Sequence, residues 1–89
     1  MKSILLVTTK GCAACTIMNR LIKEALANTK QRIEYNAKDV KGVSKELLLE
    51  HNITDFPATF FFKNDDVRYV CTGTQPAVVI NRYIDIYLK

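Results

Sequence analysis

The feature of the sequence that most restricts the possible folds is a short apolar run followed by an amphipathic stretch. The run, Ile4–Val7, is bounded by polar residues, which is typical of a strand buried on both faces of a parallel or mixed sheet. From Cys12 onward, apolar residues recur at helical spacing with polar residues between them. We therefore predict a strand over 2–8 and a helix over 12–28.

The next segment is predicted to hold a second strand and a short helix. Apolar and polar residues alternate within 31–38, which favours a strand, and Asp39–Gly42 is expected to be a connection. Ser44 can cap a helix that carries three consecutive leucines. That helix is predicted over 43–51.

The last third of the chain predicts a hairpin and a final helix. Turn-forming residues at 63–66 separate two apolar segments, Phe60–Phe62 and Val67–Cys71, as in an antiparallel hairpin. Thr74 is expected to cap the final helix, with Pro76 in its first turn. The order β-α-β-α-β-β-α predicts an α/β fold, with a four-stranded mixed sheet and helices on both faces.

Size and charge narrow the class of protein. A chain of 89 residues is long enough for one hydrophobic core, so residues 1–89 are expected to form a single domain. The net charge of +4 is spread along the chain, which argues against a nucleic-acid-binding stripe. The first apolar run is too short for a signal peptide or a membrane span. We therefore expect a monomeric protein with no nucleic-acid or membrane partner. Its expected compartment is the cytoplasm, where Cys-x-x-Cys pairs are usually catalytic or metal-binding.

The two closely spaced cysteines are the residues best suited to chemistry. Cys12 is predicted at a helix N-terminus, where free N–H groups and the helix dipole favour the nucleophilic thiolate. Cys15 returns to the same side of the helix, so it can resolve a mixed disulfide formed at Cys12. Lys10 is expected to stabilise the thiolate or meet an anionic substrate, unless it is simply a solvated loop lysine. Gly11 would let a substrate backbone approach closely.

A larger set of motifs resembles the thioredoxin family over nearly the whole chain. Cys12–Cys15 follows the apolar run Ile4–Val7, and the stretch His51–Asp66 is followed by Gly73. The resemblance implies the minimal thioredoxin fold and a thiol–disulfide oxidoreductase that reduces protein disulfides. It implies no cofactor beyond the redox-active disulfide. A thioredoxin reductase would supply the electrons, and ribonucleotide reductase is an example of a substrate.

The resemblance also assigns roles outside the cysteine pair. It implies that Pro57, at the head of a strand, is cis and packs against the cysteines. The backbone of Phe56 would then bind an extended substrate segment by strand addition. Gly73 is assigned to the same substrate-binding surface.

The sequence departs from the family pattern at three places. Gly11 stands where thioredoxins usually carry a tryptophan, Leu6 replaces a buried aspartate, and Ala13-Ala14 replaces Gly-Pro. Without the aspartate, the proton of Cys15 would pass to solvent or Lys10.

The short chain is closer to glutaredoxins and to the glutaredoxin-like reductants of ribonucleotide reductase, which makes a glutathione-dependent reductant the alternative. Glutathione-binding members usually show Gly-Gly and an acidic residue before the last helix, whereas this chain has Thr72–Pro76. A thioredoxin reductase is therefore the expected electron source, ahead of the glutathione system.

Non-catalytic roles for the cysteines are weighed as alternatives. A Gly-Cys-x-x-Cys loop before a helix also binds Cu(I) in small copper chaperones, but the predicted element order differs from theirs. Cys71 and His51 would complete four ligands for zinc, although no second closely spaced pair exists. We expect no metal, with Cys71 as a small buried residue and His51 as a helix-end or surface residue. A docking subunit with merely regulatory cysteines is the third alternative.

Overall fold

The computed structural model describes all residues from 1 to 89 and contains the predicted order of strands and α-helices. A 3₁₀ helix at Val40–Gly42 is added between the second strand and the second helix. The elements are β1 (Lys2–Thr8), α1 (Ala13–Ala27), β2 (Ile33–Asp39), α2 (Lys45–Glu50), β3 (Ala58–Lys63), β4 (Asp66–Thr72) and α3 (Ala77–Tyr87). None of the helices has both the length and the apolar character needed to cross a membrane.

The strands form one mixed sheet in the order β2-β1-β3-β4. β1 pairs in parallel with β2 and antiparallel with β3, and β3 and β4 form the predicted antiparallel hairpin. Because β1 is a central strand, its side chains are covered on both faces. Ile4 and Leu6 pack on one side of the sheet and Val7 on the other. This explains why the first apolar run is uninterrupted.

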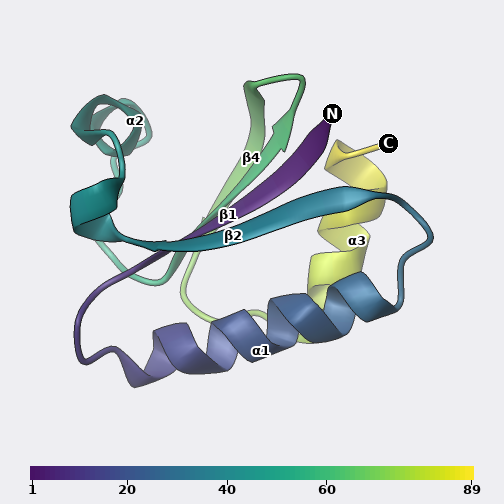
Figure 1. The fold of residues 1–89 in the computed structure, drawn as a ribbon, viewed down its shortest axis with the longest axis horizontal. Helices are drawn as coiled ribbons and strands as arrows, with labels where there is room; N and C mark the ends of the chain where they lie inside the picture. Colours follow the sequence, from purple (N-terminus) through teal and green to yellow (C-terminus); the bar gives the residue numbers. More distant parts are fainter.

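Helices cover both faces of the sheet, with α1 and α3 on one side and α2 on the other (Figure 1). The face under α1 and α3 holds the larger core. Its buried members are Ile4, Leu6, Met18, Ile22, Ala25, Phe61, Cys71, Ile80, Ile84 and Leu88. This packing fixes α1 across the sheet, so its N-terminus is held at the end of β1.

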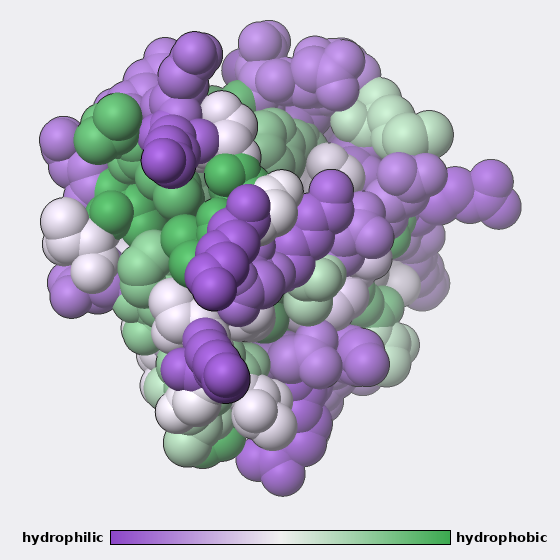
Figure 2. Space-filling view, turned by 60° about the vertical axis from the view of Figure 1, so that its left-hand side comes forward, coloured by the Kyte–Doolittle hydropathy of each residue, from purple (hydrophilic) through white to green (hydrophobic).

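The opposite face is covered by one short helix. Its buried cluster consists of Val7, Ala58 and Phe60, with half-buried apolar side chains around it. Leu49 of α2 is 76% exposed. Figure 2 shows hydrophobic side chains gathered in one region of the surface and bordered by hydrophilic ones.

The structure corrects two details of the sequence-based prediction. Asp39 belongs to β2, and the following residues form the 3₁₀ helix rather than an irregular connection. The Asp39 carboxylate stabilises the start of this helix, because it accepts a hydrogen bond from the N–H of Lys41 at 2.9 Å. Thr74 does not cap α3, and Pro76 is not in the first turn. Pro76 is itself the N-cap residue, with ψ of 150° and no side-chain hydrogen bond. Its carbonyl accepts the first helical bonds.

The expected cap of α2 is confirmed. The Ser44 hydroxyl accepts from the N–H of Leu47 at 3.4 Å. His51 is the C-cap residue of this helix, and its ring meets Phe60 edge-on with centroids 5.7 Å apart.

Candidate functional site

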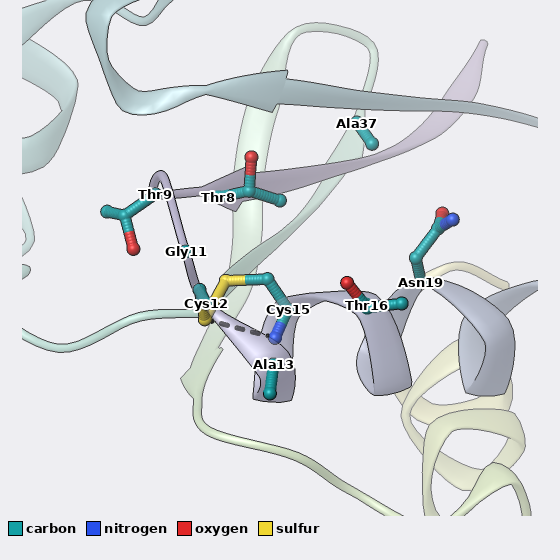
Figure 3. A pocket seen from close by; sticks show the side chains of 9 residues that line it. All are labelled: Thr8, Thr9, Gly11, Cys12, Ala13, Cys15, Thr16, Asn19 and Ala37. Atoms are coloured by element: carbon teal, nitrogen blue, oxygen red, sulfur yellow. Dashed lines mark hydrogen bonds between the residues drawn. A yellow bond between two sulfur atoms is a disulfide. The ribbon is translucent and has the colours of Figure 1, made fainter.

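The loop between β1 and α1 delivers Cys12 to the start of the helix. Gly11 has φ of +72°, a conformation that side chains disfavour, and it allows the chain to turn from the strand into the helix. Cys12 is the N-cap residue of α1. Its Sγ accepts a hydrogen bond from the backbone N–H of Cys15 at 3.0 Å (Figure 3). This N–H is one of the unpaired donors at the helix start, so the helix backbone stabilises negative charge on that sulfur.

Cys12 and Cys15 are joined by a disulfide, with their Cα atoms 5.2 Å apart. The two residues differ in accessibility. Cys12 is partly exposed, whereas Cys15, in the first turn of α1, is only 4% exposed. An attacking thiol has to reach a second molecule, and a resolving thiol needs to reach only its neighbour. The difference in burial therefore suits attack by Cys12 and resolution by Cys15.

An open hollow of about 520 Å³ lies beside the disulfide. Its lining mixes polar and apolar residues from the end of β1 and from the first two turns of α1, with Ala37 of β2 across from them (Figure 3). The lining residues are Thr8, Thr9, Gly11, Cys12, Ala13, Cys15, Thr16, Asn19 and Ala37. Cys15 lines this hollow with the 4% of its surface that is exposed.

The residues around Pro57 occupy the other flank of the cysteine pair. Ala58 pairs with Val7, so Pro57 lies beside the end of β1 from which the loop to Cys12 departs. The Phe56–Pro57 peptide bond is cis, and Pro57 is buried. The Pro57 carbonyl accepts from the N–H of Gly73 at 2.8 Å. This contact holds the β4–α3 loop next to Pro57.

Comparison with solved structures identifies the architecture. A thioredoxin-2 of the malaria parasite superimposes with a TM-score of 0.78 at 16% identity, over 96% of this chain and 82% of that one. A chloroplastic thioredoxin z superimposes with a TM-score of 0.75 at 17% identity, over 96% of this chain and 76% of that one. The chain has a thioredoxin fold. No family model matches its sequence, and no curated protein is significantly similar to it.

Within this thioredoxin fold, Leu6 stands where thioredoxins usually carry a buried aspartate, and its surroundings are apolar. Leu6 is completely buried in the core under α1 and α3. The hollow beside Cys15 contains no acidic side chain and no lysine. Lys10 is exposed and lies outside the hollow lining.

The remaining predicted site residues are distributed over two flanks. Gly11 lines the hollow with the cysteines, whereas Phe56, Pro57 and Gly73 do not. Phe56 is half-buried against the cluster on the α2 face. The thioredoxin fold thus brings Pro57 and Gly73 into contact with each other.

Four polar residues of the hollow were not singled out from the sequence: Thr8, Thr9, Thr16 and Asn19. A signal for two of them was present. Thr16 and Asn19 follow Cys12 and Cys15 by four residues each, and this spacing places side chains on one face of a helix. Ala37 carries no such signal, because only the pairing of β1 with β2 brings it to the hollow.

The four residues considered as zinc ligands are not assembled. Cys71 is buried in the core under α1 and α3, while the His51 ring lies against Phe60 on the opposite face of the sheet. No group of three or more His, Cys, Asp and Glu side chains is placed to hold a metal ion. Burial raises the pKa of the Cys71 thiol to about 11, which opposes the thiolate form that binds metals.

Proposed function

We propose that this protein is a thiol–disulfide oxidoreductase that reduces disulfides in other proteins. The observation that carries the proposal is the asymmetric pair at the head of α1. Cys12 is partly exposed, and its Sγ accepts a hydrogen bond from the backbone N–H of Cys15. Cys15 is buried beside it. A structural disulfide would not require a helix N-terminus or an accessible sulfur, whereas a nucleophilic cysteine benefits from both.

The proposed reaction starts from the dithiol form. The Cys12 thiolate attacks one sulfur of the substrate disulfide, which forms a mixed disulfide and releases the first substrate thiolate. Cys15 then gives its proton to water in the hollow and attacks the Sγ of Cys12. This second exchange releases the other substrate thiolate and leaves the Cys12–Cys15 disulfide. Two electrons have passed to the substrate, and its two thiolates take up protons from solvent.

The surface around Pro57 is the proposed docking site for the substrate backbone. The Phe56 backbone would pair with an extended segment, while Gly73 and Gly11 leave room for it. A Cβ at either glycine would have no atom within 4 Å, so both border open space. Lys10 is exposed and available to an anionic part of the substrate. We propose a thioredoxin reductase as the electron source, and substrates of the kind that ribonucleotide reductase represents.

Insulin reduction tests both the activity and the electron source. The protein is assayed with NADPH and thioredoxin reductase, and separately with glutathione and glutathione reductase. We expect turnover in the first system and little in the second. The reverse pattern would support the glutathione-dependent alternative, and failure of both would contradict the proposed activity.

Trapping tests the roles of the two cysteines. Cys15→Ser should accumulate a mixed disulfide with insulin through Cys12, because the resolving thiol is gone. Mass spectrometry of the trapped peptide identifies the cysteine involved. Cys12→Ser should give no trap and no turnover, and Cys71→Ala is the matched control that should behave as the unmodified protein. A stable trap through Cys71 would overturn the assignment.

A further inference from the structure

The resolving cysteine has no proton acceptor in its immediate surroundings. Cys15 is 4% exposed and lines the hollow beside the disulfide, whose lining contains no carboxylate and no imidazole. Lys10 follows the lining residue Thr9, but an ammonium group has no lone pair that could take a proton. Since the thiolate is the form that attacks a disulfide, the resolving step depends on solvent or on a base beyond the lining.

The strand β2 brings a carboxylate to the edge of this hollow. Ala37 pairs with Leu6, which is buried in the core under α1 and α3. Asp39 pairs with Thr8. Because side chains alternate along a strand, Ala37 and Asp39 point to the face that α1 covers, and Lys38 points to the other face. Ala37 and Thr8 both line the hollow (Figure 3), so the exposed Asp39 side chain lies at its rim.

The Asp39 carboxylate is held in place by the backbone that follows it. Its Oδ1 accepts a hydrogen bond from the N–H of Lys41 at 2.9 Å, which caps the 3₁₀ helix. A carboxylate has two oxygens with about four lone-pair sites, so this bond leaves it free to accept from a water molecule as well. Carboxylates that face water are ionised at neutral pH. Asp39 is therefore a fixed and charged acceptor at the rim of the hollow.

Water molecules can connect Asp39 with Cys15 through the hollow. Its volume of about 520 Å³ has room for several of them, since one water occupies about 30 Å³. The hydroxyls of Thr8 and Thr16 line this space and can hold water by hydrogen bonds. The Thr8 hydroxyl already donates to the carbonyl of Lys38 at 3.3 Å, so its lone pairs are the part left for water.

The other titratable groups in the core around Cys15 keep their protons at neutral pH. Burial raises the pKa of Tyr35, on the same face of β2, to about 12. On β4, burial raises the pKa of Cys71 to about 11. A hydrogen bond to Tyr83 of α3, together with burial, raises the pKa of Tyr69 to about 12. None of these groups competes with a carboxylate as a proton acceptor.

We propose that Asp39 is the proton acceptor for Cys15 in the resolving step. The Cys15 S–H bond breaks as its proton passes through water in the hollow to the Asp39 carboxylate. The Cys15 sulfur then forms a bond to the Sγ of Cys12, and the bond between Cys12 and the substrate sulfur breaks. The leaving thiolate takes a proton from solvent, and Asp39 returns its own proton to solvent. The inference rests on the proposed function, in which Cys15 resolves a mixed disulfide.

Single-turnover reduction of a chromogenic aryl disulfide measures the resolving step. The dithiol protein, in excess, is mixed with the disulfide in a stopped-flow instrument. Attack by Cys12 releases the first coloured thiolate, and resolution by Cys15 releases the second. The second phase therefore reports on Cys15, and its rate is recorded from about pH 6 to about pH 10, the range in which thiols ionise.

Asp39→Asn should slow the second phase about tenfold at about pH 6, because the thiol then loses its base. The difference should shrink toward about pH 10, where thiols ionise without a base. The direction of the effect identifies the role. A carboxylate that acted only through its charge would disfavour the Cys15 thiolate, so its removal would speed the second phase.

The variants remove the carboxylate without removing the helix cap. Asn and Ser both carry a side-chain oxygen that can cap the 3₁₀ helix, so Asp39→Ser gives the same test if Asp39→Asn folds poorly. Glu34→Gln is the matched control. Glu34 is an exposed carboxylate of the same strand, and it pairs with Ser3 on the opposite face of the sheet. This variant should resolve at the rate of the unmodified protein.

The outcomes separate the role of Asp39 from the function on which it rests. A second phase in Asp39→Asn that is as fast as in the unmodified protein, or faster, would overturn the role of Asp39 and leave the oxidoreductase activity in place. A loss that is equally large at every pH would also overturn it, since a lost base matters only while the thiol is protonated. Failure of the unmodified protein to release the second thiolate would overturn the proposed function itself.

Discussion

At the scale of single residues, the three cysteines of the chain occupy different chemical environments. Cys12 is partly exposed at a helix start, Cys15 is buried beside it, and Cys71 is buried in the core. The spacing in the sequence marked the first two as a pair, and the predicted order of the surrounding elements favoured redox chemistry over a metal site. The burial of Cys71 was also predicted, since a cysteine on a strand behaves as a small apolar residue.

Alkylation of the reduced protein should therefore be selective. At pH 8, we expect iodoacetamide to modify Cys12 and to leave Cys71 unmodified until urea unfolds the chain. Burial raises the pKa of Cys71 to about 11 from an ordinary 9.0, so its thiolate fraction is lowered about a hundredfold. Peptide mass spectrometry after timed quenching measures both sites. Modification of Cys71 at the rate of a free cysteine peptide would show that it is accessible.

At the scale of elements, the loop from β4 to α3 depends on Gly73. This residue has φ of +79° and donates its N–H to the Pro57 carbonyl. The sequence marked this region as a helix start but assigned the cap to Thr74. Pro76 is the N-cap residue instead. Its ψ is extended, and its carbonyl accepts hydrogen bonds from the N–H groups of Val79 and Ile80. Local cap preferences could not foresee that the contact with Pro57 sets the course of this loop.

Gly73→Ala should lower the free energy of unfolding by about 1 kcal/mol, because a Cβ is strained at positive φ. No atom lies within 4 Å of the added Cβ, so the cost comes from the backbone alone. Gly42→Ala is the matched control: its Cβ also meets nothing, and its φ is not positive. We expect it to be neutral or to stabilise by about 0.5 kcal/mol. Urea titration of both variants measures the difference, and equal effects would contradict the backbone explanation.

At the scale of the whole molecule, the core under α1 and α3 contains groups that ionise less readily in the folded state. Burial raises the pKa of Cys71 to about 11 and that of Tyr35 to about 12. As the pH rises above 9, the unfolded chain loses these protons first. The free energy of unfolding is therefore unaffected by these groups below about pH 9 and decreases as the pH approaches 11 to 12.

Urea unfolding of the disulfide form at pH 8 and at pH 10.5 tests this dependence, because Cys12 and Cys15 do not titrate when they are oxidised. We expect lower stability at the higher pH. Cys71→Val should reduce the loss, since it removes the group with a raised pKa that titrates at the lowest pH. Tyr35→Phe should reduce it less, because Tyr35 titrates at a higher pH. Equal pH dependence in all three proteins would show that other groups are responsible.

The sequence by itself determined the element order, the two-sided burial of β1 and the position of the cysteine pair. These features follow from periodicity and local geometry, which act over a few residues. Only the tertiary structure decided which residues surround the pair. The parallel pairing of β1 with β2 brings Ala37 to the hollow, and the pairing of β1 with β3 sets Pro57 on the other flank. Such contacts join residues far apart in the chain, so they exist only once the sheet has formed.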